Sequence, residues 1–469
     1  MKNNFKKLFT DSIFYKNLCI IALPIVIQNL IGCLLNFMDV IMVGKLGVAE
    51  IASVGIANQY FFLFNLLVMG LYSGCGIFIS QFWGKQDTKN IKKVLGVALI
   101  SGVCISILFT IVGIIMPEKI ISIFSKDVTV VNLGAGFLRI VCISYIFTAI
   151  TFAYSAALRC VEKAIVPMTI SAIALLINTI LNYIFIFGKF GFDTMGVRGA
   201  AIATVIARII EAIIMVIYTY KYNEVLATKV SDMLEITKNF VFSVYKTAIH
   251  VVLNDACWGL GTLMYAAIYG RIGKEAVASV QICTTIQNIF MVIVLGLANA
   301  SSIMIGNKIG SGEEETGKIY AKRFCVLGII VAISLAGLLA LSAPSILSFF
   351  NVSTNVLHDS LIILYITSLI FIVRVFDIIL IVGILRGGGD AKYSLLIEGL
   401  TMWLIGVPLA LIGAFILKLP VYLVVALVTV EEIVKCYFAV KRLLSNKWIN
   451  NVIKNMDREV VAPLTEIEV

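Results

Sequence analysis

Carboxylates inside long apolar segments are the residues of this sequence most able to do chemistry. Asp39, Asp255 and Asp377 each lie within a run of mostly apolar residues. A carboxylate in hydrocarbon is costly, so such residues usually bind ions or substrates. Carboxylate oxygens can bind a hard cation such as Na⁺ or load and release a proton, and their charge attracts organic cations.

Two of these carboxylates also have a structural explanation. Asp39 precedes Gly44 by five residues, so a position at a solvated helix end would also account for it. Asp377 has Arg374 one turn earlier, a spacing that also fits a buried ion pair. No residue near Asp255 in the sequence neutralises it. The binding interpretation is therefore favoured at Asp255.

Four glutamates within apolar segments are weaker candidates: Glu211, Glu398, Glu431 and Glu432. Arg208 lies one turn from Glu211, and Lys435 lies one turn from Glu431 and Glu432. We expect local ion pairs at these positions, with the second group close to the water-exposed end of its helix.

A second polar group lies in the N-terminal half. Asn178 and Asn182 are one helical turn apart, and Thr204 lies in the next apolar segment. Gln28 follows Pro24 by four residues in the first segment. Amides inside membranes also join helices by hydrogen bonds, so either role is open. Pro24 removes a backbone hydrogen bond, and we expect a hinge there.

Aromatic residues near the C-terminal candidates suggest a wall for a cationic ligand. Trp258 lies one turn from Asp255, and Tyr265 and Phe290 are further candidates for cation–π contacts. Most aromatic residues in membrane proteins serve packing or interfacial anchoring instead. Trp258 is the preferred choice because it shares a helix face with Asp255.

The composition shows what must position these residues. Of the 469 residues, 60% are hydrophobic and only 14% are charged, against about 25% in soluble domains. The mean hydropathy is +1.03. These values exclude a soluble enzyme, a disordered chain and a nucleic-acid-binding protein. The net charge of +10 is explained by loop residues that set membrane orientation.

The segments are apolar on every face, which predicts helices rather than the alternating strands of a membrane barrel. A spanning helix needs about 20 mostly apolar residues. We therefore predict an all-α polytopic membrane protein with twelve transmembrane helices, at residues 18–42, 54–80, 94–116, 131–157, 165–188, 197–219, 241–268, 277–304, 324–350, 356–384, 394–415 and 420–440.

An internal repeat divides these helices into two bundles. At a shift of 226 residues, Gly44-Lys-Leu-Gly47 falls on Gly270-Arg-Ile-Gly273, and at 227 Leu158-Arg159 falls on Leu385-Arg386. A six-helix offset is even, so the repeat is parallel, with a pseudo-two-fold axis along the membrane normal. The expected parts are an N-terminal six-helix bundle, a cytoplasmic connector, a C-terminal six-helix bundle and a cytoplasmic tail, at residues 1–222, 223–240, 241–445 and 446–469.

Lysine and arginine residues indicate the orientation. They are concentrated in the N-terminus, the loops after even-numbered spans and the C-terminal segment, whereas the other loops hold only eight. The positive-inside rule then places both termini in the cytoplasm and the chain in the plasma membrane. The ten cysteines form no C-x-x-C pair and there are two histidines, so no metal site beyond a Na⁺ site is expected.

Several segments together resemble the multidrug and toxic compound extrusion (MATE) family, over essentially the whole chain. They read LPIVIQNLIGCLLNFMDVIMVGKLG, EIASVGIANQ, GIFISQFWGKQD, NDACWGLGTLMYAAIYGRIGKEAVAS and DIILIVGILRGGGDAK. The resemblance implies a V-shaped arrangement of two bundles and cation-coupled drug export. It also implies that the first span moves.

The resemblance further suggests roles for the polar residues. Asp255 and Asp377 fall where the bacterial NorM-like branch carries an acidic cation site, although the residue at 255 is usually glutamate. Asp39, Asn178, Asn182 and Thr204 resemble the polar cation site of another branch, in which the position of Asn182 is typically aspartate.

We therefore expect a secondary active exporter that exchanges cationic drugs for inward Na⁺ or H⁺. It would act as a monomer in the lipid bilayer, without a cofactor, an ATPase subunit or a nucleic-acid partner. The alternative is a flippase of lipid-linked saccharides, which would use arginines within spans, such as Arg139 and Arg374. A membrane enzyme would need clustered carboxylates or histidines at one interface, and the sequence shows no such cluster.

Overall fold

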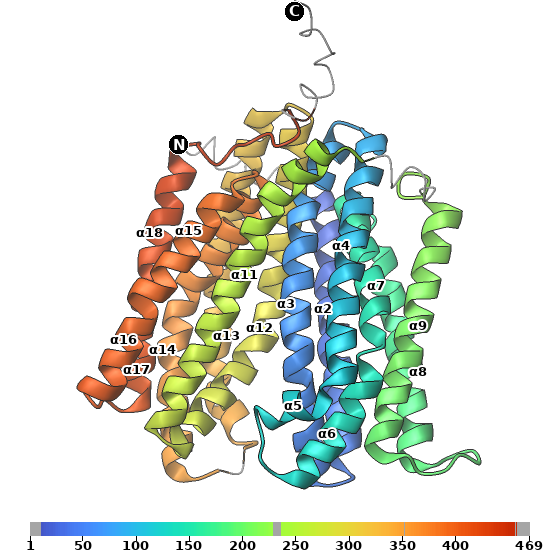
Figure 1. Ribbon diagram of the computed structural model, residues 1–469. Helices are drawn as coiled ribbons and strands as arrows, with labels where there is room; N and C mark the ends of the chain where they lie inside the picture. Colours follow the sequence, from blue (N-terminus) through green and yellow to red (C-terminus); the bar gives the residue numbers. More distant parts are fainter. Residues whose placement is uncertain (1–10, 228–235, 351, 455, 457–469) are drawn as a thin grey trace, which may run out of the picture. The chain divides into compact units, whose positions relative to one another are not determined.

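The computed structural model describes residues 11–227, 236–350, 352–454 and 456, and these residues form helices joined by loops, with no β-strand among them (Figure 1). The α-helices that precede the central connector are α2 (Ser12–Gly44), α3 (Val48–Gly84), α4 (Thr88–Ile115), α5 (Pro117–Ser122), α6 (Val128–Val141), α7 (Ser144–Cys160), α8 (Ile165–Phe187) and α9 (Gly196–Tyr222).

The second half contains α-helices and three π-helices. They are α11 (Lys238–Ile272), α12 (Lys274–Gly310), α13 (Glu314–Leu347), α14 (Thr354–Ile378), η1 (Ile379–Leu385), α15 (Ala391–Thr401), η2 (Met402–Gly406), α16 (Val407–Leu411), η3 (Ile412–Ile416), α17 (Val421–Val428) and α18 (Val430–Leu444). The π-helices lie in the tenth and eleventh predicted spans.

The helices occupy the positions of the twelve predicted spans, although not all of them are long enough to count as spans by themselves. Within the described residues, ten helices are long and apolar enough to cross a membrane. The pair α6 and α7, bent by 51°, would form an eleventh. The short helices α17 and α18, which meet at Thr429, occupy the position of the twelfth predicted span.

Local sequence signals determine where several helices begin and end. Asp87 starts α4 by accepting a hydrogen bond from the backbone N–H of Asn90, and Asp127 starts α6 in the same way. Ser353 starts α14 through the N–H of Val356. Gly188 ends α8 in the left-handed conformation. Short polar residues therefore separate the apolar segments.

Contacts between residues divide the chain into two compact units. We call Leu23–Ala248 the N-terminal unit and the remainder, which includes the residues up to Ala22, the C-terminal unit. The division falls inside α2 and α11, because both helices continue across it, and not at the 223–240 connector expected from composition. It lies next to Pro24, the expected hinge.

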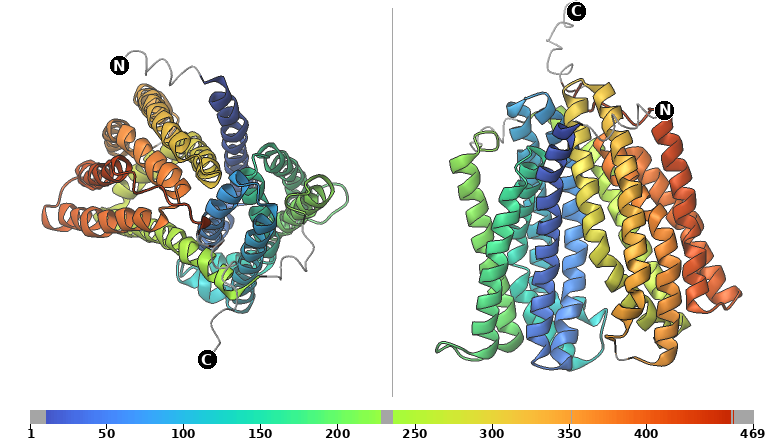
Figure 2. Two further views of the ribbon diagram at one scale, coloured as in Figure 1. Left: turned by 90° about the horizontal axis from the view of Figure 1, so that it is seen from above. Right: turned by 180° about the vertical axis from the view of Figure 1, so that it is seen from behind.

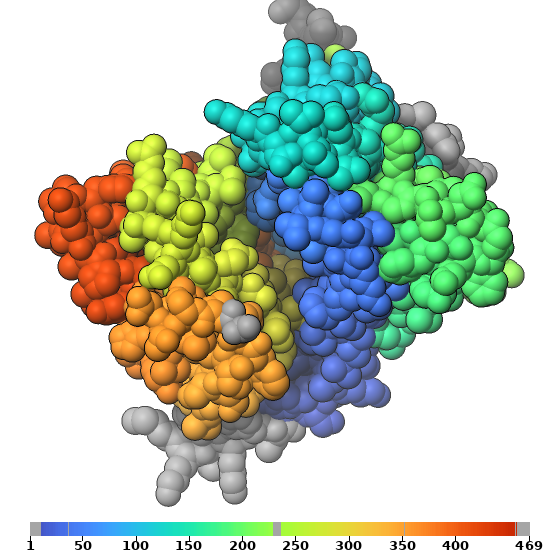
Figure 3. Space-filling model, turned by 90° about the horizontal axis from the view of Figure 1, so that it is seen from below, coloured from blue at the N-terminus to red at the C-terminus, as the bar shows by residue number. Residues whose placement is uncertain are grey.

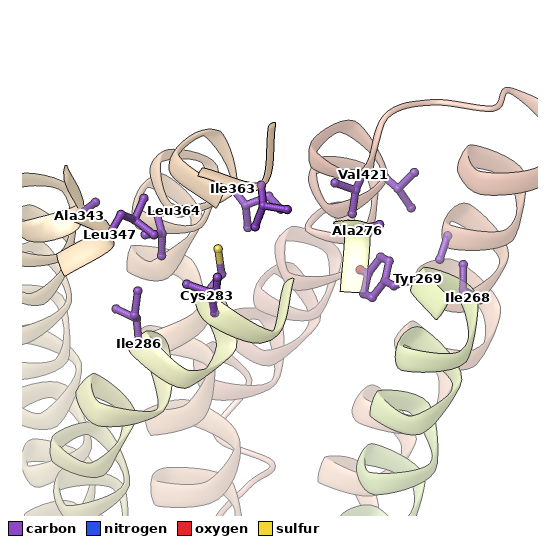
Figure 4. Close-up of a cluster of buried hydrophobic side chains, with 14 of the residues drawn as sticks. Ile268, Tyr269, Ala276, Cys283, Ile286, Ala343, Leu347, Ile363, Leu364 and Val421 are labelled. Atoms are coloured by element: carbon purple, nitrogen blue, oxygen red, sulfur yellow. The ribbon is translucent and has the colours of Figure 1, made fainter. Parts of the chain in front are cut away.

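Each unit is built from helices packed along their neighbours. In the N-terminal unit α8 packs against α9, and in the C-terminal unit α13 packs against α14 (Figure 2). On the face shown in Figure 3, the blue α2–α3 turn of the N-terminal unit borders the cyan α5–α6 segment and the green α8–α9 loop. The C-terminal unit has an apolar core where α11 ends and α12 begins. In this core Cys283 lies near Leu364, and Tyr269 lies near Ala276 (Figure 4).

The first part of each unit follows the 226-residue repeat. Helices α3 and α12 are each 37 residues long and begin 226 residues apart, at Val48 and Lys274. Gly47 and Gly273, which precede them, have φ angles of 157° and 158°. Helices α4 and α13 also start 226 residues apart. The structure therefore agrees with the repeat at the level of helix boundaries.

One inserted residue explains why the shift becomes 227. Thr151 and Asp377, both buried, correspond at 226, whereas Leu158 and Leu385 correspond at 227. Between these points the N-terminal unit keeps the α-helix α7, and the C-terminal unit forms η1. A π-helical turn accommodates one extra residue within a helix, and such turns are frequent at functional sites. Here it directly follows Asp377.

Two buried pairs in the later helices agree with the 227 shift. Ile170 of α8 and Ile397 of α15 are both buried, as are Ala212 of α9 and Ala439 of α18.

Candidate functional site

The four polar residues expected in the N-terminal unit lie together. Asn182 donates through Nδ2 to Asp39 Oδ1 and to Asn178 Oδ1, the second at 3.0 Å. Asn178 donates through Nδ2 to Thr204 Oγ1 at 3.5 Å. Both asparagines are fully buried. Three helices, α2, α8 and α9, thus contribute to one polar site.

A cavity of about 50 Å³ opens beside this site, and space of this size holds a few water molecules or an ion. Asp39, Thr204 and Arg208 contribute its polar wall. The rest of its lining is Leu35, Val43, Val54, Asn58, Phe61, Phe137, Val141, Ser144, Tyr145, Thr148 and Ala200. The whole lining belongs to the N-terminal unit, which makes this a cavity within a bundle.

The unsatisfied groups at this site suit a hard monovalent cation. The Oδ1 atom of Asn182 is buried and has no hydrogen-bond partner among the described residues. Thr204 donates its hydroxyl proton to the carbonyl of Ala200 at 2.9 Å and accepts from Asn178, which leaves one lone pair of its oxygen without a partner. Together with the carboxylate of Asp39, these oxygens are the ligand type that Na⁺ prefers.

A second polar chain lies next to the cavity. Arg208 pairs with Glu211 at 2.7 Å, as its spacing predicted. Glu211 is only 2% exposed and also accepts a hydrogen bond from Ser171 of α8 at 3.1 Å. Gln28 of α2 donates to Ser171 at 3.3 Å. The ion pair with Glu211 on the same helix therefore positions Arg208 beside the cavity. Gln28 belongs to this second polar group and not to the Asp39 site.

Asp377 is a buried carboxylate without a hydrogen-bonding nitrogen or oxygen partner in the described structure. It is 1% exposed, and the charges nearest to it belong to Glu432, Lys435 and Glu398. The local pair with Arg374 that the spacing allowed does not form. Arg374 instead contacts Glu432 at 3.7 Å and donates to Gln287 at 3.2 Å.

Lys435 lies at the centre of a buried group of carboxylates, which we call the Lys435 cluster. Its Nζ atom lies 2.9 Å from Glu431, 3.3 Å from Glu432 and 3.1 Å from Glu398. Glu431 and Lys435 are 3% and 5% exposed.

The local pairs of Lys435 with Glu431 and Glu432 form as the spacing predicted. The expected water-exposed position is wrong, because the group is buried, and Glu398 of another helix joins it. The only sequence signal for Glu398 was its place within an apolar segment.

Asp255 has partners different from those of Asp377. Its Oδ1 atom lies 2.7 Å from Arg386, whose side chain is 7% exposed. This pair joins α11 to the turn after η1. The described contacts therefore place the two carboxylates in separate groups, although both belong to the C-terminal unit.

The aromatic candidates also separate. Trp258 is 41% exposed and belongs to neither polar group. Tyr265 donates its hydroxyl to Glu431 at 2.7 Å and so belongs to the Lys435 cluster. Phe290 packs edge-to-face on Phe371, with the ring centroids 6.5 Å apart.

Two helical units with a parallel repeat and buried carboxylates within apolar helices are typical of a membrane transporter. The MatE family model matches residues 24–184 and 251–412. The chain therefore belongs to the MatE family, which confirms the resemblance noted from the sequence. Its members are multi-pass membrane transporters and not enzymes.

Relatives are similar over most of their length. A probable multidrug resistance protein YoeA of Bacillus subtilis is 23% identical over 410 residues, which cover 87% of this chain and 88% of that protein. A probable multidrug resistance protein NorM of Thermotoga maritima is 24% identical over 404 residues, with 85% of each chain covered.

Among solved structures, an outward-facing multidrug resistance MATE family transporter of the MOP superfamily matches with a TM-score of 0.83 at 18% identity, over 92% of this chain and 96% of that one. This similarity confirms the predicted fold class.

Proposed function

We propose that the protein exports organic cations from the cell in exchange for Na⁺ or H⁺. The observation that carries this proposal is the Asp39 site with its adjoining cavity in the N-terminal unit. The names of its relatives, which are probable multidrug resistance proteins, support the drug substrates. We propose that the protein acts as a monomer in the plasma membrane, with both termini in the cytoplasm, and that it needs no cofactor.

The charge of the Asp39 site suits a monovalent coupling ion. Asp39 supplies one negative charge, and Asn182 supplies an amide in place of a second carboxylate. One Na⁺ or one proton neutralises this site. Each elementary charge that enters across a potential of about 100 mV supplies roughly 2.3 kcal/mol, so ion entry can drive export.

Exchange requires that the ion and the substrate favour different states of the protein. Ion binding at Asp39 changes the charge at the cavity, because the carboxylate is then compensated. The neighbouring polar chain from Gln28 to Arg208 links the same three helices, so a change at Asp39 acts on helices that also pack around the cavity. Pro24 supplies the expected hinge in α2.

The flippase alternative receives less support from the arginines. Arg139 pairs with Glu118 at 2.8 Å, and its side chain is 52% exposed. Arg374 is held by Glu432 and Gln287. Neither arginine is therefore available to a pyrophosphate group without first leaving an acidic or amide partner.

The test is uptake of a fluorescent organic cation into vesicles that contain the purified protein, with Na⁺ and proton gradients imposed separately. We expect uptake to follow one of the gradients and to stop when an ionophore collapses it. Asp39→Asn should reduce gradient-driven uptake at least tenfold, whereas Asp193→Asn, in the exposed α8–α9 loop, should not. Uptake that ignores both gradients would exclude ion exchange.

A further inference from the structure

The Lys435 cluster leaves few oxygen atoms for a metal ion. Lys435 contacts one oxygen each of Glu398, Glu431 and Glu432. The second oxygen of Glu431 accepts from Tyr265, and that of Glu432 lies 3.7 Å from Arg374. Among the described residues of the cluster, only the second carboxylate oxygen of Glu398 is left without a polar contact. Within the same residues, no three acidic, histidine or cysteine side chains converge as a metal site.

The internal repeat places this cluster where the N-terminal unit has its cavity. At the 227 shift Thr204 corresponds to Glu431 and Arg208 to Lys435, and at 226 Asp39 corresponds to Tyr265. The cavity lining in one unit thus corresponds to cluster members in the other. Phe61 and Thr148, also in the lining, correspond at 226 to Gln287 and Arg374, which contact each other.

The two matched cations are used differently. Arg208 forms its ion pair with Glu211 of its own helix, so Asp39 has Arg208 as a neighbour across the cavity but not as a direct ion-pair partner. The position that matches Glu211 is Phe438, so Lys435 has no acid one turn later on α18. Its ammonium group instead points into the carboxylates, where a free cation would otherwise be attracted.

We infer that Lys435 is a tethered cation that occupies the carboxylate cluster of the C-terminal unit and excludes Na⁺ from it. The physical reason is competition for the same oxygens: three carboxylates that already surround an ammonium group cannot also replace the water shell of Na⁺. The inference rests on the proposed function only for the identity of the N-terminal site.

The test measures equilibrium binding of radioactive Na⁺ to the purified full-length protein, without transport. In the Asp39→Asn/Asp377→Asn variant, which lacks the two uncompensated carboxylates outside the cluster, we expect no saturable Na⁺ binding. Adding Lys435→Met, which keeps an unbranched side chain only one atom shorter and removes the charge, should create a Na⁺ site. Adding Lys435→Arg, the charge-preserving control, should not create one. A folded variant that combines Lys435→Met with both aspartate substitutions and binds no Na⁺ would overturn the inference.

A second measurement covers the case in which Lys435→Met does not fold. If Lys435 excludes Na⁺, Glu431→Gln in the Asp39→Asn/Asp377→Asn background changes nothing, because there is no Na⁺ binding to lose. Saturable binding in that background that Glu431→Gln abolishes would show that Na⁺ enters the cluster beside Lys435, and would refute exclusion. If the wild-type protein itself binds no Na⁺, that result would contradict Na⁺ binding at Asp39. It would concern the proposed function and not the role of Lys435.

Discussion

At the scale of single residues, each buried charge of this protein is defined by the partner that surrounds it. Asp255 pairs with Arg386, which is 131 residues away in the chain, and Lys435 with Glu398, which is 37 residues away. Asp39 accepts from the amide of Asn182 and has no direct ion pair, because Arg208, which lines the same cavity, pairs with Glu211. The two aspartates therefore differ in charge environment, since Asp255 is compensated by a direct ion pair and Asp39 is not.

We predict that Asp255→Asn destabilises the protein by leaving Arg386 buried without its counter-charge. The cost of breaking a buried pair is on the order of 3 kcal/mol, and removal of both charges usually costs less. Thermal unfolding in detergent should therefore give a lower midpoint for Asp255→Asn than for Asp255→Asn/Arg386→Gln. Equal or additive losses would show that the pair is not coupled and would return Asp255 to the list of ion-binding candidates.

At the scale of elements, the turn after η1 shows how glycines let segments approach. A Cβ added at Gly387 would lie 2.7 Å from the backbone of Ser302 in α12, and one at Gly388 would lie 2.5 Å from the carbonyl of Trp448. The N–H of Asn450 donates to the carbonyl of Gly388 at 2.7 Å. The run of glycines, read from the sequence as a tight turn, is thus also a docking point for the segment after α18.

We predict that Gly387→Ala lowers the unfolding temperature, because backbone of α12 would have to move. The matched control is Gly337→Ala in α13, where an added Cβ meets nothing within 4 Å. In a helix that change should be neutral or stabilising by about 0.5–1 kcal/mol. A stable Gly387→Ala variant would mean that the turn tolerates a shift away from α12.

The start of α2 is held in the C-terminal unit by contacts with α13. Asp11 pairs with Arg323 of α13 at 2.6 Å, and Phe14 packs edge-to-face on Phe324. The hydrogen bond from Arg323 lowers the pKa of Asp11 below its usual value of 3.8.

We predict a pH-dependent contribution from Asp11. Because its folded pKa is lowered, its stabilisation is fully present above about pH 4 and is lost as the pH falls through the folded pKa. The difference in unfolding midpoint between wild type and Asp11→Asn should be constant from about pH 7 to 5 and shrink below pH 4. In an Arg323→Gln background, Asp11→Asn should have little effect at any of these values.

At the scale of the whole molecule, the described ends of the chain lie at one end of the C-terminal unit. Asp11 contacts Arg323 near the start of α13, and Asn451 donates to the carbonyl of Ile309 near the end of α12. An even number of membrane crossings produces this arrangement. The basic loops at the same end are expected to face the cytoplasm.

We predict the orientation from this arrangement and the loop charges. In a background without native cysteines, Asp193→Cys in the α8–α9 loop should react with a membrane-impermeant maleimide in intact cells. Lys89→Cys, exposed at the start of α4, should react only after permeabilisation. The reverse pattern would place the termini outside and contradict the proposed direction of export.

The sequence by itself determined the class, the repeat and the shared helix face of Asn178 and Asn182, whereas the grouping of these two with Asp39 and Thr204 was implied only by the family resemblance. Long apolar segments can satisfy their backbone in lipid only as helices, so composition and segment length settle the fold class. Asn178 and Asn182 are one turn apart on one helix, so their shared face follows from helical spacing.

Only the tertiary structure decided which charges compensate one another. The pairs Asp255–Arg386 and Glu398–Lys435 join residues on different helices, and helical spacing carries no information about neighbours on another helix. The same limit applies to η1, because the sequence shows a shift from 226 to 227 but not where the extra residue is placed. The structure accommodates the extra residue close to Asp377, in the π-helical turn η1.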